Sequence, residues 1–383
     1  MANTLKFGNG EWYGKKDAIL AYNDENNNFK PLPFDFSRGS TATVVNKDGL
    51  IETVGSGEPR IDYKDNTKGA LLLEPSRTNL VPYSEDFSQW NKSNVAITIT
   101  TNYGLSPDGL NNSSRVQFTD ASQHINISTS LGTGVTSTGS VYIKGTLGEI
   151  IRFDTGGVGG LKTLTGDWQR IEVTSTSVSS LLLINTFGGA TARDIQVFGA
   201  QCEQASYATS YIPTQGSVVT RLADSCSQTV PDGVIGQTEG TIFVSLNLGE
   251  STTDTISTPI RFSLNNGVSS DNWIFVGNES GDNLRVYVRA NASTSVDFTK
   301  NNVFPSSGNY KIAMSFKSNE TKCYVNGVLQ YNGSLGIIPN NLNSIGLGSV
   351  ITGDAVSVKS QIKEYKLYNT ALTDQELQAL TTI

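Results

Sequence analysis

The sequence predicts an all-β protein: two β-sandwich (jelly-roll) domains that follow an extended N-terminal segment. Composition is the first observation, because 38 glycines, abundant Ser, Thr and Asn and only 16% charged residues suit short strands joined by tight turns. The second is a long succession of short segments that alternate apolar and polar residues at period two, the pattern of half-buried strands. The third is length, since 383 residues exceed what one hydrophobic core usually organises.

Residues 1–78 form the expected N-terminal segment. Asp48 and Gly49 separate VVNK from LIETV and predict a β-hairpin, because both turn residues tolerate positive φ. The stretch AYNDENNNFKPLPF, residues 21–34, is too polar and too marked by proline to build a core alone. We therefore expect an extended segment that becomes ordered against a partner subunit or a second copy of the chain.

Residues 79–215 are predicted to form a jelly roll. Each of eight segments has β-branched or aromatic residues at period two and ends at Gly, Ser, Asp or Asn, as a strand of a small sandwich does. The eight candidate strands are VAITITT, SRVQFT, HINIST, GSVYIKG, EIIRFDT, QRIEVTST, LLLINTF and RDIQVFGAQ.

Residues 216–238 are predicted to be a linker, and residues 239–383 a second sandwich with its own series of alternating segments. Asn326-Gly327 inside KCYVNGVLQY predicts a type I′ hairpin. The closing TDQELQALTT has helical spacing, with Thr373 three residues before Glu376 as a capping box. A short terminal helix is expected there.

Charge and hydropathy exclude two classes of partner. The net charge is −7, the pI is near 4.9, and the longest basic cluster is Lys15-Lys16, so a nucleic-acid backbone finds no footprint. No run reaches the roughly 18 apolar residues that span a bilayer, and MANTLKFGNGEW lacks the features of a signal peptide. We expect that the protein does not insert into a membrane and that it is synthesised in a cytoplasm.

The cysteines predict neither a disulfide framework nor a metal site. Cys202, Cys226 and Cys323 are odd in number and far apart. We interpret them as buried apolar residues.

Catalytic groups are scarce, and the sequence predicts that the protein is not an enzyme. The single histidine, His124, alternates with Ile125 and Ile127 and is interpreted as an outward-facing strand residue; no G-x-S-x-G motif occurs. Glycoside hydrolysis needs two carboxylates that flank the scissile bond. Glu279 and Asp282 come nearest, and they lie in an expected loop.

No cofactor is expected, with Ca²⁺ kept as the alternative. Oxygen ligands occur in Asn265-Asn266-Gly267 with Asp271, and at Asp254. Asn, Asp and Gly are also the ordinary residues of hairpin turns, and we favour that interpretation. The sequence predicts no metal ligands.

Sugar binding by a sandwich needs exposed aromatic faces beside hydrogen-bonding groups. Core packing is the commoner use of any single ring, and we expect it for Trp90 and Trp168 at strand edges. The candidates for carbohydrate binding are Tyr142, Trp273, Tyr287 and Tyr331.

The stretch ASYATSYIPTQGSVVTRLADSC, residues 205–226, joins the two expected sandwiches. Tyr207 and Tyr211 are predicted to pack back on the first one. Arg221 and Asp224 are candidates for an oligomer contact or a linker contact. Neutral polar residues prevail over the chain, which suits broad contacts with proteins or polysaccharides.

Two blocks resemble structural proteins of tailed bacteriophages. One is GAQCEQASYATSYIPTQGSVVTRLAD, residues 199–224, which resembles the end of a carbohydrate-binding-module-like jelly roll. Its companion is FDFSRGSTATVVNKDGLIETV, residues 34–54, with EPRIDY and ALLLEPSRTNLVPYSEDFSQW. LKFGNGEW and AYNDENNNFKPLPFDF look like an attachment segment of crAss-like and other phages of Bacteroides-type hosts.

The C-terminal part resembles laminin-G-like or concanavalin-A-like lectin domains. The residues that carry this resemblance are NYKIAMSFK, YVNGVLQ and IKEYKLYNTALTDQELQAL. Calcium ligands of lectin domains do not map clearly on this sequence, and none is carried over.

These resemblances imply a virion appendage, a head fibre, tail fibre or decoration protein. It would contact other virion proteins (capsid or tail) through residues 1–78, form a homodimer or homotrimer, and meet a cell-surface polysaccharide. It would be located in the virion, assembled in the bacterial cytoplasm and released by lysis. The alternatives are a capsular-polysaccharide depolymerase and a host-side secreted lectin or adhesin.

Overall fold

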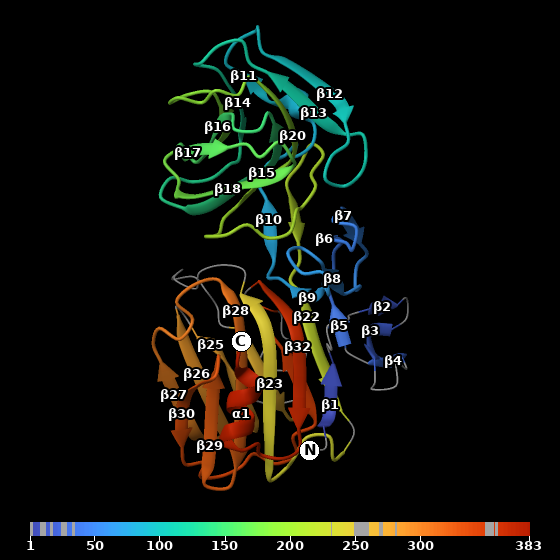
Figure 1. The fold of residues 1–383 in the computed structure, drawn as a ribbon, viewed down its shortest axis with the longest axis vertical. Coiled ribbons are helices and arrows are strands. Elements are labelled where there is room, and N and C mark those ends of the chain that lie inside the picture. The colour runs from blue at the N-terminus through green and yellow to red at the C-terminus, as the bar shows by residue number, and fades with distance from the viewer. Residues whose placement is uncertain are drawn as a thin grey trace. The chain divides into compact units, whose positions relative to one another are not determined.

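The structure, a computed structural model, forms two compact units. It describes residues 3–7, 13–15, 18–23, 29–32, 35–230, 232–248, 260–267, 271–279, 282–348, 356 and 359–383. Unit 1 comprises Met1–Thr41, Val54–Ser76 and Leu222–Ile383, and unit 2 comprises Ala42–Thr53 and Arg77–Arg221. The expected all-β class is confirmed (Figure 1), because strands make up nearly all the regular structure in the described ranges.

Unit 2 is a sandwich of two five-stranded antiparallel sheets, as expected for a jelly roll. Their strand orders are β11-β14-β19-β16-β17 and β12-β13-β20-β15-β18. The bounds of the first sheet are β11 Asn91–Lys92, β14 His124–Ser128, β16 Ile150–Thr155, β17 Val158–Thr163 and β19 Leu181–Asn185. Those of the second are β12 Thr98–Gly104, β13 Ser113–Gln117, β15 Thr136–Gly145, β18 Gln169–Thr176 and β20 Asp194–Glu203.

Smaller elements complete unit 2. A hairpin pairs β6 (Ala42–Val45) with β7 (Ile51–Val54), and a second pair joins β10 (Arg77–Asn79) to β21 (Val219–Arg221). The hairpin turn contains Asp48-Gly49, as predicted, and Gly49 has a φ of 79°. The short 3-10 helix η1 (Phe87–Gln89) begins after Asp86, whose side chain accepts a hydrogen bond from the Ser88 amide.

The core of unit 2 follows from the alternation of its strands. On β15, Val141 and Ile143 are fully buried in the core, whereas Tyr142 between them faces the other side of the sheet. Trp90 stacks on Phe87 with ring centroids 4.8 Å apart, and both rings are buried in the core. The predicted role of Trp90 as a core plug is therefore confirmed.

Unit 1 is a larger sandwich of two antiparallel sheets. The eight-stranded sheet has the order β30-β29-β28-β23-β32-β9-β8, with β1 also paired to β32, and the seven-stranded sheet has the order β27-β26-β25-β24-β31-β22-β5. The first sheet comprises β1 Asn3–Phe7, β8 Arg60–Asp62, β9 Ala70–Leu73, β23 Glu239–Leu248, β28 Gly308–Lys317, β29 Glu320–Val325, β30 Val328–Gly333 and β32 Ser360–Tyr368. The second comprises β5 Asp35–Ser37, β22 Ser225–Thr229, β24 Arg261–Asn265, β25 Trp273–Glu279, β26 Asn283–Ala290, β27 Ser293–Lys300 and β31 Ser344–Leu347.

Two further elements belong to unit 1. A three-stranded sheet consists of β2 Tyr13–Lys15, β3 Ala18–Asn23 and β4 Phe29–Leu32. The helix α1, Asp374–Thr381, begins after Thr373, and the predicted capping box with Glu376 is present. The predicted Asn326-Gly327 turn joins β29 to β30, and both of its residues have positive φ.

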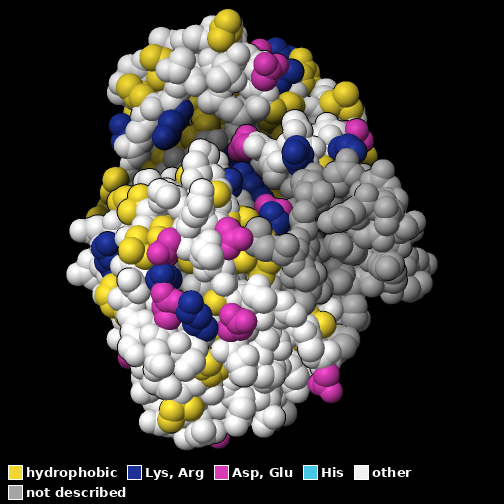
Figure 2. All heavy atoms as spheres, turned by 60° about the horizontal axis from the view of Figure 1, so that its bottom comes forward, with side chains coloured by type: hydrophobic (Ala, Val, Ile, Leu, Met, Phe, Trp, Pro, Cys, Tyr) yellow, Lys and Arg dark blue, Asp and Glu magenta, His cyan; other side chains and the backbone are white. Residues whose placement is uncertain are grey.

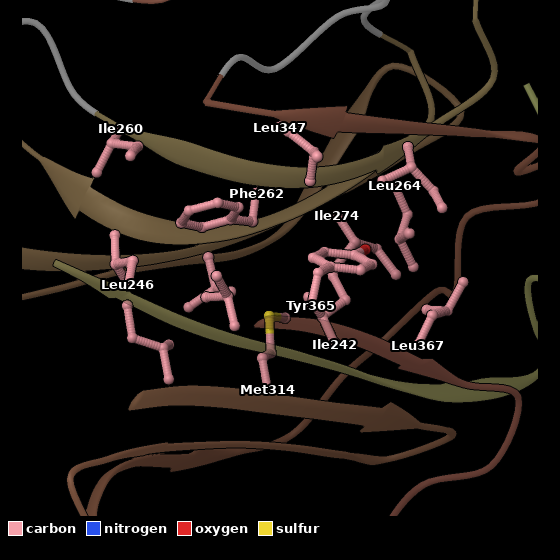
Figure 3. Packing of buried hydrophobic residues seen from close by; sticks show 14 of the residues in the cluster. Ile242, Leu246, Ile260, Phe262, Leu264, Ile274, Met314, Leu347, Tyr365 and Leu367 are labelled. Atoms are coloured by element: carbon pink, nitrogen blue, oxygen red, sulfur yellow. The ribbon is translucent and has the colours of Figure 1, made fainter. Parts of the chain in front are cut away.

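The core of unit 1 lies between its two large sheets. In Figure 3 the labelled apolar side chains of both sheets fill the space between the ribbons. All but Ile260, which directly precedes β24, come from β23, β28 and β32 on one side and from β24, β25 and β31 on the other. Alternate residues of each strand face inward, which accounts for the period-two pattern of the sequence.

The N-terminal segment differs from the expectation in one respect. Residues 35–76 do not extend away from the chain, because β5, β8 and β9 are strands of the unit 1 sheets. Ser37 lies opposite Ser225 in one sheet, and Leu71 lies opposite Ile362 in the other. We expected this segment to become ordered against another protein. Residues 35–76 instead pack against the C-terminal sandwich of the same chain, and Phe36, Leu71 and Leu73 complete its core.

The predicted linker, residues 216–238, also contains regular structure. Its strand β21 pairs with β10, and its strand β22 pairs with β31 and β5. The second sandwich therefore begins at about Leu222 in the sequence and includes two earlier segments of the chain.

The three cysteines are free and buried, as predicted. Burial raises the pKa of the Cys202 thiol to about 12 and that of Cys226 and Cys323 further still. Within the described residues, no helix is long and apolar enough to cross a membrane.

Candidate functional site

Unit 2 contains an open, polar pocket of about 490 Å³. Its lining comes from the loop around η1, from β12, from the residue before β13, and from the stretch that follows β20. The lining residues are Tyr83, Glu85, Asp86, Ser88, Thr101, Asn102, Asn112, Thr214 and Gln215. Its volume falls within the range of about 300–1,000 Å³ that is usual for small-molecule sites.

One wall of the pocket is fixed by hydrogen bonds between distant parts of unit 2. Tyr83 and Gln215 form an antiparallel bridge. The Ser84 amide donates to Thr214 Oγ1 at 3.0 Å, and the Thr214 amide donates to Ser84 Oγ at 2.8 Å. These bonds hold the lining residues in place without a ligand, which lowers the entropic cost of binding.

Glu85 is a lining residue whose carboxyl pKa is shifted. Its Oε1 accepts a hydrogen bond from the Tyr211 hydroxyl at 2.9 Å, and Tyr211 itself is buried. Burial raises the pKa of the Glu85 carboxyl, with a further contribution from the negative charge of Asp108. The predicted packing of Tyr211 on the jelly roll is confirmed, and it orients a carboxyl group of the pocket.

Asp86, the next residue in the lining, caps the helix η1. Its Oδ1 accepts from the Ser88 amide at 3.1 Å and caps η1, and its Oδ2 accepts from Gln89 Nε2 at 3.3 Å. The two adjacent carboxyl groups therefore differ in role: Asp86 is engaged with its own loop, whereas Glu85 is held by a neighbouring tyrosine.

Asn112 presents an unpaired acceptor. Its Nδ2 donates to Asp108 Oδ2 at 2.9 Å, which fixes the amide, but its buried Oδ1 has no hydrogen-bond partner in the described part of the chain. A buried acceptor without a partner costs free energy, and a ligand donor would remove that cost. Asn102 is held nearby by Asn111 Nδ2, which donates to its carbonyl oxygen at 3.2 Å.

This arrangement suits ligand binding. Amide, hydroxyl and carboxyl groups recognise a ligand with several hydroxyl groups, and Tyr83 adds an aromatic surface. Among the described residues that line the pocket there is no histidine or cysteine. Nowhere in the described ranges do three His, Cys, Asp or Glu side chains form a group that could hold a metal ion.

Two of the four aromatic candidates come together in unit 1. Trp273 on β25 and Tyr287 on β26 surround Phe275 on the sheet face that is turned away from the core. Phe275 and Tyr287 stack with centroids 5.1 Å apart, and Trp273 meets Tyr287 edge-on at 5.6 Å. Tyr287 is buried and Trp273 is only partly exposed, so Trp273 offers the more accessible ring.

Charged side chains frame this aromatic group. Arg261 lies 4.8 Å from the Phe275 ring centroid, and Arg285 lies 4.9 Å from that of Tyr287. Both arginines are paired with Glu279, at 2.9 and 3.3 Å. Glu279 is therefore an ion-pair partner of both arginines.

The other two aromatic candidates lie apart from this group. Tyr142, in unit 2, contacts Phe198 with centroids 6.2 Å apart and lies under the Arg170 guanidinium at 5.5 Å. Tyr331, in unit 1, packs against Phe298 at 4.4 Å and against the core. Sugar binding by any of the four stays a prediction.

Arg221 and Asp224 are both buried within the single chain, so their side chains are not displayed to a second copy. Asp224 accepts from Arg38 at 3.1 Å and from Arg60 at 2.6 Å, all inside unit 1. Of the two alternatives for Asp224, these contacts fit the one within the chain, because its carboxylate pairs with both buried guanidinium groups. An oligomer contact of either residue stays a prediction.

Of the proposed calcium ligands, Asn265 is buried, and its Oδ1 accepts from the Gly267 amide at 2.8 Å, as in an ordinary turn. Asp254 lies outside the described residues. His124 is half-buried beside Phe187, with ring centroids 5.6 Å apart, and burial lowers its pKa. The geometry around Asn265 fits turn formation, and Ca²⁺ stays the untested alternative to the expectation of no cofactor.

Sequence reasoning missed the pocket in unit 2. Its residues come from three separate loop segments and from the middle of β12, so their convergence has no local signal. The sequence signal that was available is the YSEDFSQW stretch, which joins a tyrosine and two adjacent acids to an aromatic core plug.

A protein-family model matches the C-terminal part of the chain. Residues 225–378 match the family model described as the Concanavalin A-like lectin/glucanases superfamily. The C-terminal part of the chain is thus similar to lectin-like domains, as the resemblance implied. No curated protein matches the chain.

Several solved structures are similar to part of the chain. One is the Ruminococcus gnavus IT-sialidase CBM40 bound to α2,3-sialyllactose, at 17% identity over 39% of this chain and 84% of that chain, with a TM-score of 0.33. Another is the leech intramolecular trans-sialidase, at 16% identity over 41% of this chain and 26% of that chain, with a TM-score of 0.33. A third is the binding domain of botulinum neurotoxin DC in complex with rat synaptotagmin II, at 11% identity over 41% of this chain and 39% of that chain, with a TM-score of 0.33.

Proposed function

We propose that this protein is a structural component of a tailed-phage virion, a head fibre, tail fibre or decoration subunit, that binds glycans of host or environmental surfaces. The observation that carries the binding part is the pre-formed polar pocket of unit 2, with its unpaired Asn112 acceptor. The lectin-like domain supports the same function, because residues 225–378 match a family of lectins and glucanases.

The composition of the surface also supports a binding function. On the face shown in Figure 2, neutral polar side chains and backbone cover most of the described surface, and charged groups of both signs are interspersed. Such a surface makes many neutral hydrogen bonds, as glycan and protein contacts require.

The virion role rests on the resemblance of residues 34–90 and 199–224 to phage structural proteins. We propose that residues 1–78 carry the contact with capsid or tail proteins, through surfaces that their strands do not use within unit 1. The protein would then be a homodimer or homotrimer located in the virion. Multiple copies on one particle would strengthen weak individual glycan contacts through avidity.

The binding function is tested with the purified full chain on an array of bacterial surface glycans. We expect binding that the Asn112→Ala variant weakens, whereas the Asn126→Ala variant binds like the wild type. Asn126 is a suitable control because it lies on β14, is half-buried and does not line the pocket. Binding that is equal for all three proteins would contradict a role for the pocket.

The same samples distinguish the alternatives. Release of reducing ends from capsular polysaccharide would favour a depolymerase. Immunogold labelling of phage particles tests the virion role, and an absence of label on purified particles would favour a host-side adhesin. Light scattering measures the oligomer, and a monomer would contradict the proposed assembly.

A further inference from the structure

The charge of the unit 2 pocket distinguishes classes of sugar. Two carboxyl groups, Glu85 and Asp86, line it, and Asp108 is close enough to Glu85 to act on its charge. Among the described lining residues there is no lysine or arginine to pair with an acidic ligand. An anion in this pocket would meet like charge without compensation.

The hydrogen-bonding groups of the pocket favour donors on the ligand. Asn112 Oδ1 is an unpaired acceptor, and the Glu85 carboxyl is an acceptor that Tyr211 holds in place. One N–H of the Asn112 amide is donated to Asp108 Oδ2, which fixes the side chain and leaves its Oδ1 without a hydrogen-bond partner among the described residues. Sugar hydroxyl groups supply such donors, whereas a carboxylate supplies none.

Two cations of the strands in unit 2 are engaged with other groups. Arg115 pairs with Asp194, and its guanidinium lies 4.9 Å from the ring centroid of the exposed Tyr103. Lys92 Nζ donates to the Ile97 carbonyl at 3.1 Å. Neither residue lines the pocket.

We propose that the pocket of unit 2 selects uncharged sugars with several hydroxyl groups and rejects acidic sugars such as uronic and sialic acids. This inference rests on the proposed function and adds the ligand class. The carboxyl groups accept hydrogen bonds from ring hydroxyls, Asn112 Oδ1 accepts another, and Tyr83 contacts the apolar face of the ring. An acidic sugar loses these bonds at its carboxylate and meets the charges of Glu85 and Asp86.

The test uses the full chain and matched methyl glycosides. The pairs are glucoside with glucuronide, galactoside with galacturonide, and N-acetylglucosaminide with N-acetylneuraminide, measured at pH 7 by ligand-observed NMR titration. We expect at least one neutral member to bind, with its acidic counterpart at least about tenfold weaker, because like charges face each other at short range.

A charge-neutral variant locates the cause of the discrimination. Glu85→Gln with Asp86→Asn keeps an acceptor for Tyr211 and a residue that caps η1 well. We expect it to bring the acidic sugar to within about threefold of its neutral partner, since the repulsion is removed. Asp167→Asn is the matched control, because Asp167 is exposed in unit 2 and does not line the pocket.

A measurement on the wild-type protein guards against a variant that fails to fold. Raising the salt concentration from 20 to 500 mM shortens the Debye length from about 20 to about 4 Å, so the discrimination should fall several-fold. Discrimination that depends neither on salt nor on the double variant would overturn the inference, as would acidic sugars that bind equally well. If neither class binds, the proposed glycan function of the pocket fails as well.

Discussion

The Arg60 guanidinium lies 2.6 Å from the Asp224 carboxylate, and both side chains are fully buried in unit 1. Arg60 belongs to β8, near the start of the chain, whereas Asp224 precedes β22 in the C-terminal sandwich. Arg38 donates to the other Asp224 oxygen at 3.1 Å, and Glu74 pairs with Arg60 at 2.7 Å. Two cations and two anions thus join three separate segments of sequence in one buried cluster.

The first prediction concerns this cluster. Asp224→Asn should lower the free energy of unfolding of unit 1 by about 3–5 kcal/mol, because it leaves two buried arginines with one carboxylate. Denaturant unfolding of the full chain measures the effect. Asp297→Asn is the control: its pair with Arg285 is partly exposed, so a loss of at most about 1 kcal/mol is expected. Equal losses in the two variants would contradict the assigned role.

The second prediction concerns the N-terminal strands. A fragment of residues 222–383 should not fold cooperatively, because it lacks β5, β8 and β9 and with them Phe36, Leu71 and Leu73 of the core. Co-expression with residues 1–76 should restore soluble, cooperatively unfolding protein. Calorimetry checks both results, and a sharp unfolding transition of the fragment alone would show that the early strands are dispensable.

The same strands show where sequence reasoning ends. The eight candidate strands of the jelly roll were recognised because alternation is a local signal, and β15 shows it at Val141, Tyr142 and Ile143. In contrast, β5 and β8 have three residues each, too few for a period to be visible. Their place in the sheets depends on partners far along the chain, as with Ser37 and Ser225.

The candidate site was less predictable than the fold for a related reason. Aromatic residues on strands were named because rings carry a recognisable chemistry, and Trp273 and Tyr287 do lie together. The pocket instead joins Tyr83, Asn112 and Gln215, which lie in loops and resemble any turn residue. Only the closure of the sandwich brings them to one place.

The third prediction concerns pH. Burial raises the pKa of Glu85 in the folded protein above its ordinary value of 4.5, so the folded state binds this proton more tightly than the unfolded state. Ionisation of Glu85 therefore lowers the free energy of unfolding as the pH rises above that value. Glu85→Gln should leave the stability of unit 2 unchanged near pH 4 and raise it relative to the wild type at pH 7. Thermal unfolding followed by calorimetry checks this.

Asp194 provides the opposite sign as a control in the same unit. The hydrogen bond from Arg115 holds the pKa of the Asp194 carboxyl below its ordinary value of 3.8. Its contribution to stability is therefore present above that value and is lost as the pH falls through the folded pKa. Asp194→Asn should be less stable than the wild type at pH 7 and approach it at low pH. Parallel pH profiles for the two variants would contradict both assignments.

The last prediction separates packing from binding at the aromatic group of unit 1. Tyr287 is buried against Phe275 on the outer face of the sheet, so Tyr287→Ala should cost about 3 kcal/mol of stability, at the low end for large buried aromatic residues. Trp273 meets the same rings edge-on but is partly exposed, so Trp273→Phe, which keeps an aromatic contact, should cost about 1 kcal/mol. Denaturant unfolding measures both costs.

The same variant tests sugar binding at Trp273. If Trp273 stacks on a sugar, the folded Trp273→Phe variant should bind glycans on the array more weakly than the wild type. The Asn112→Ala variant in the other unit should keep the part of the binding that depends on Trp273. Unchanged glycan binding in Trp273→Phe would assign this ring to packing and leave the pocket of unit 2 as the binding site.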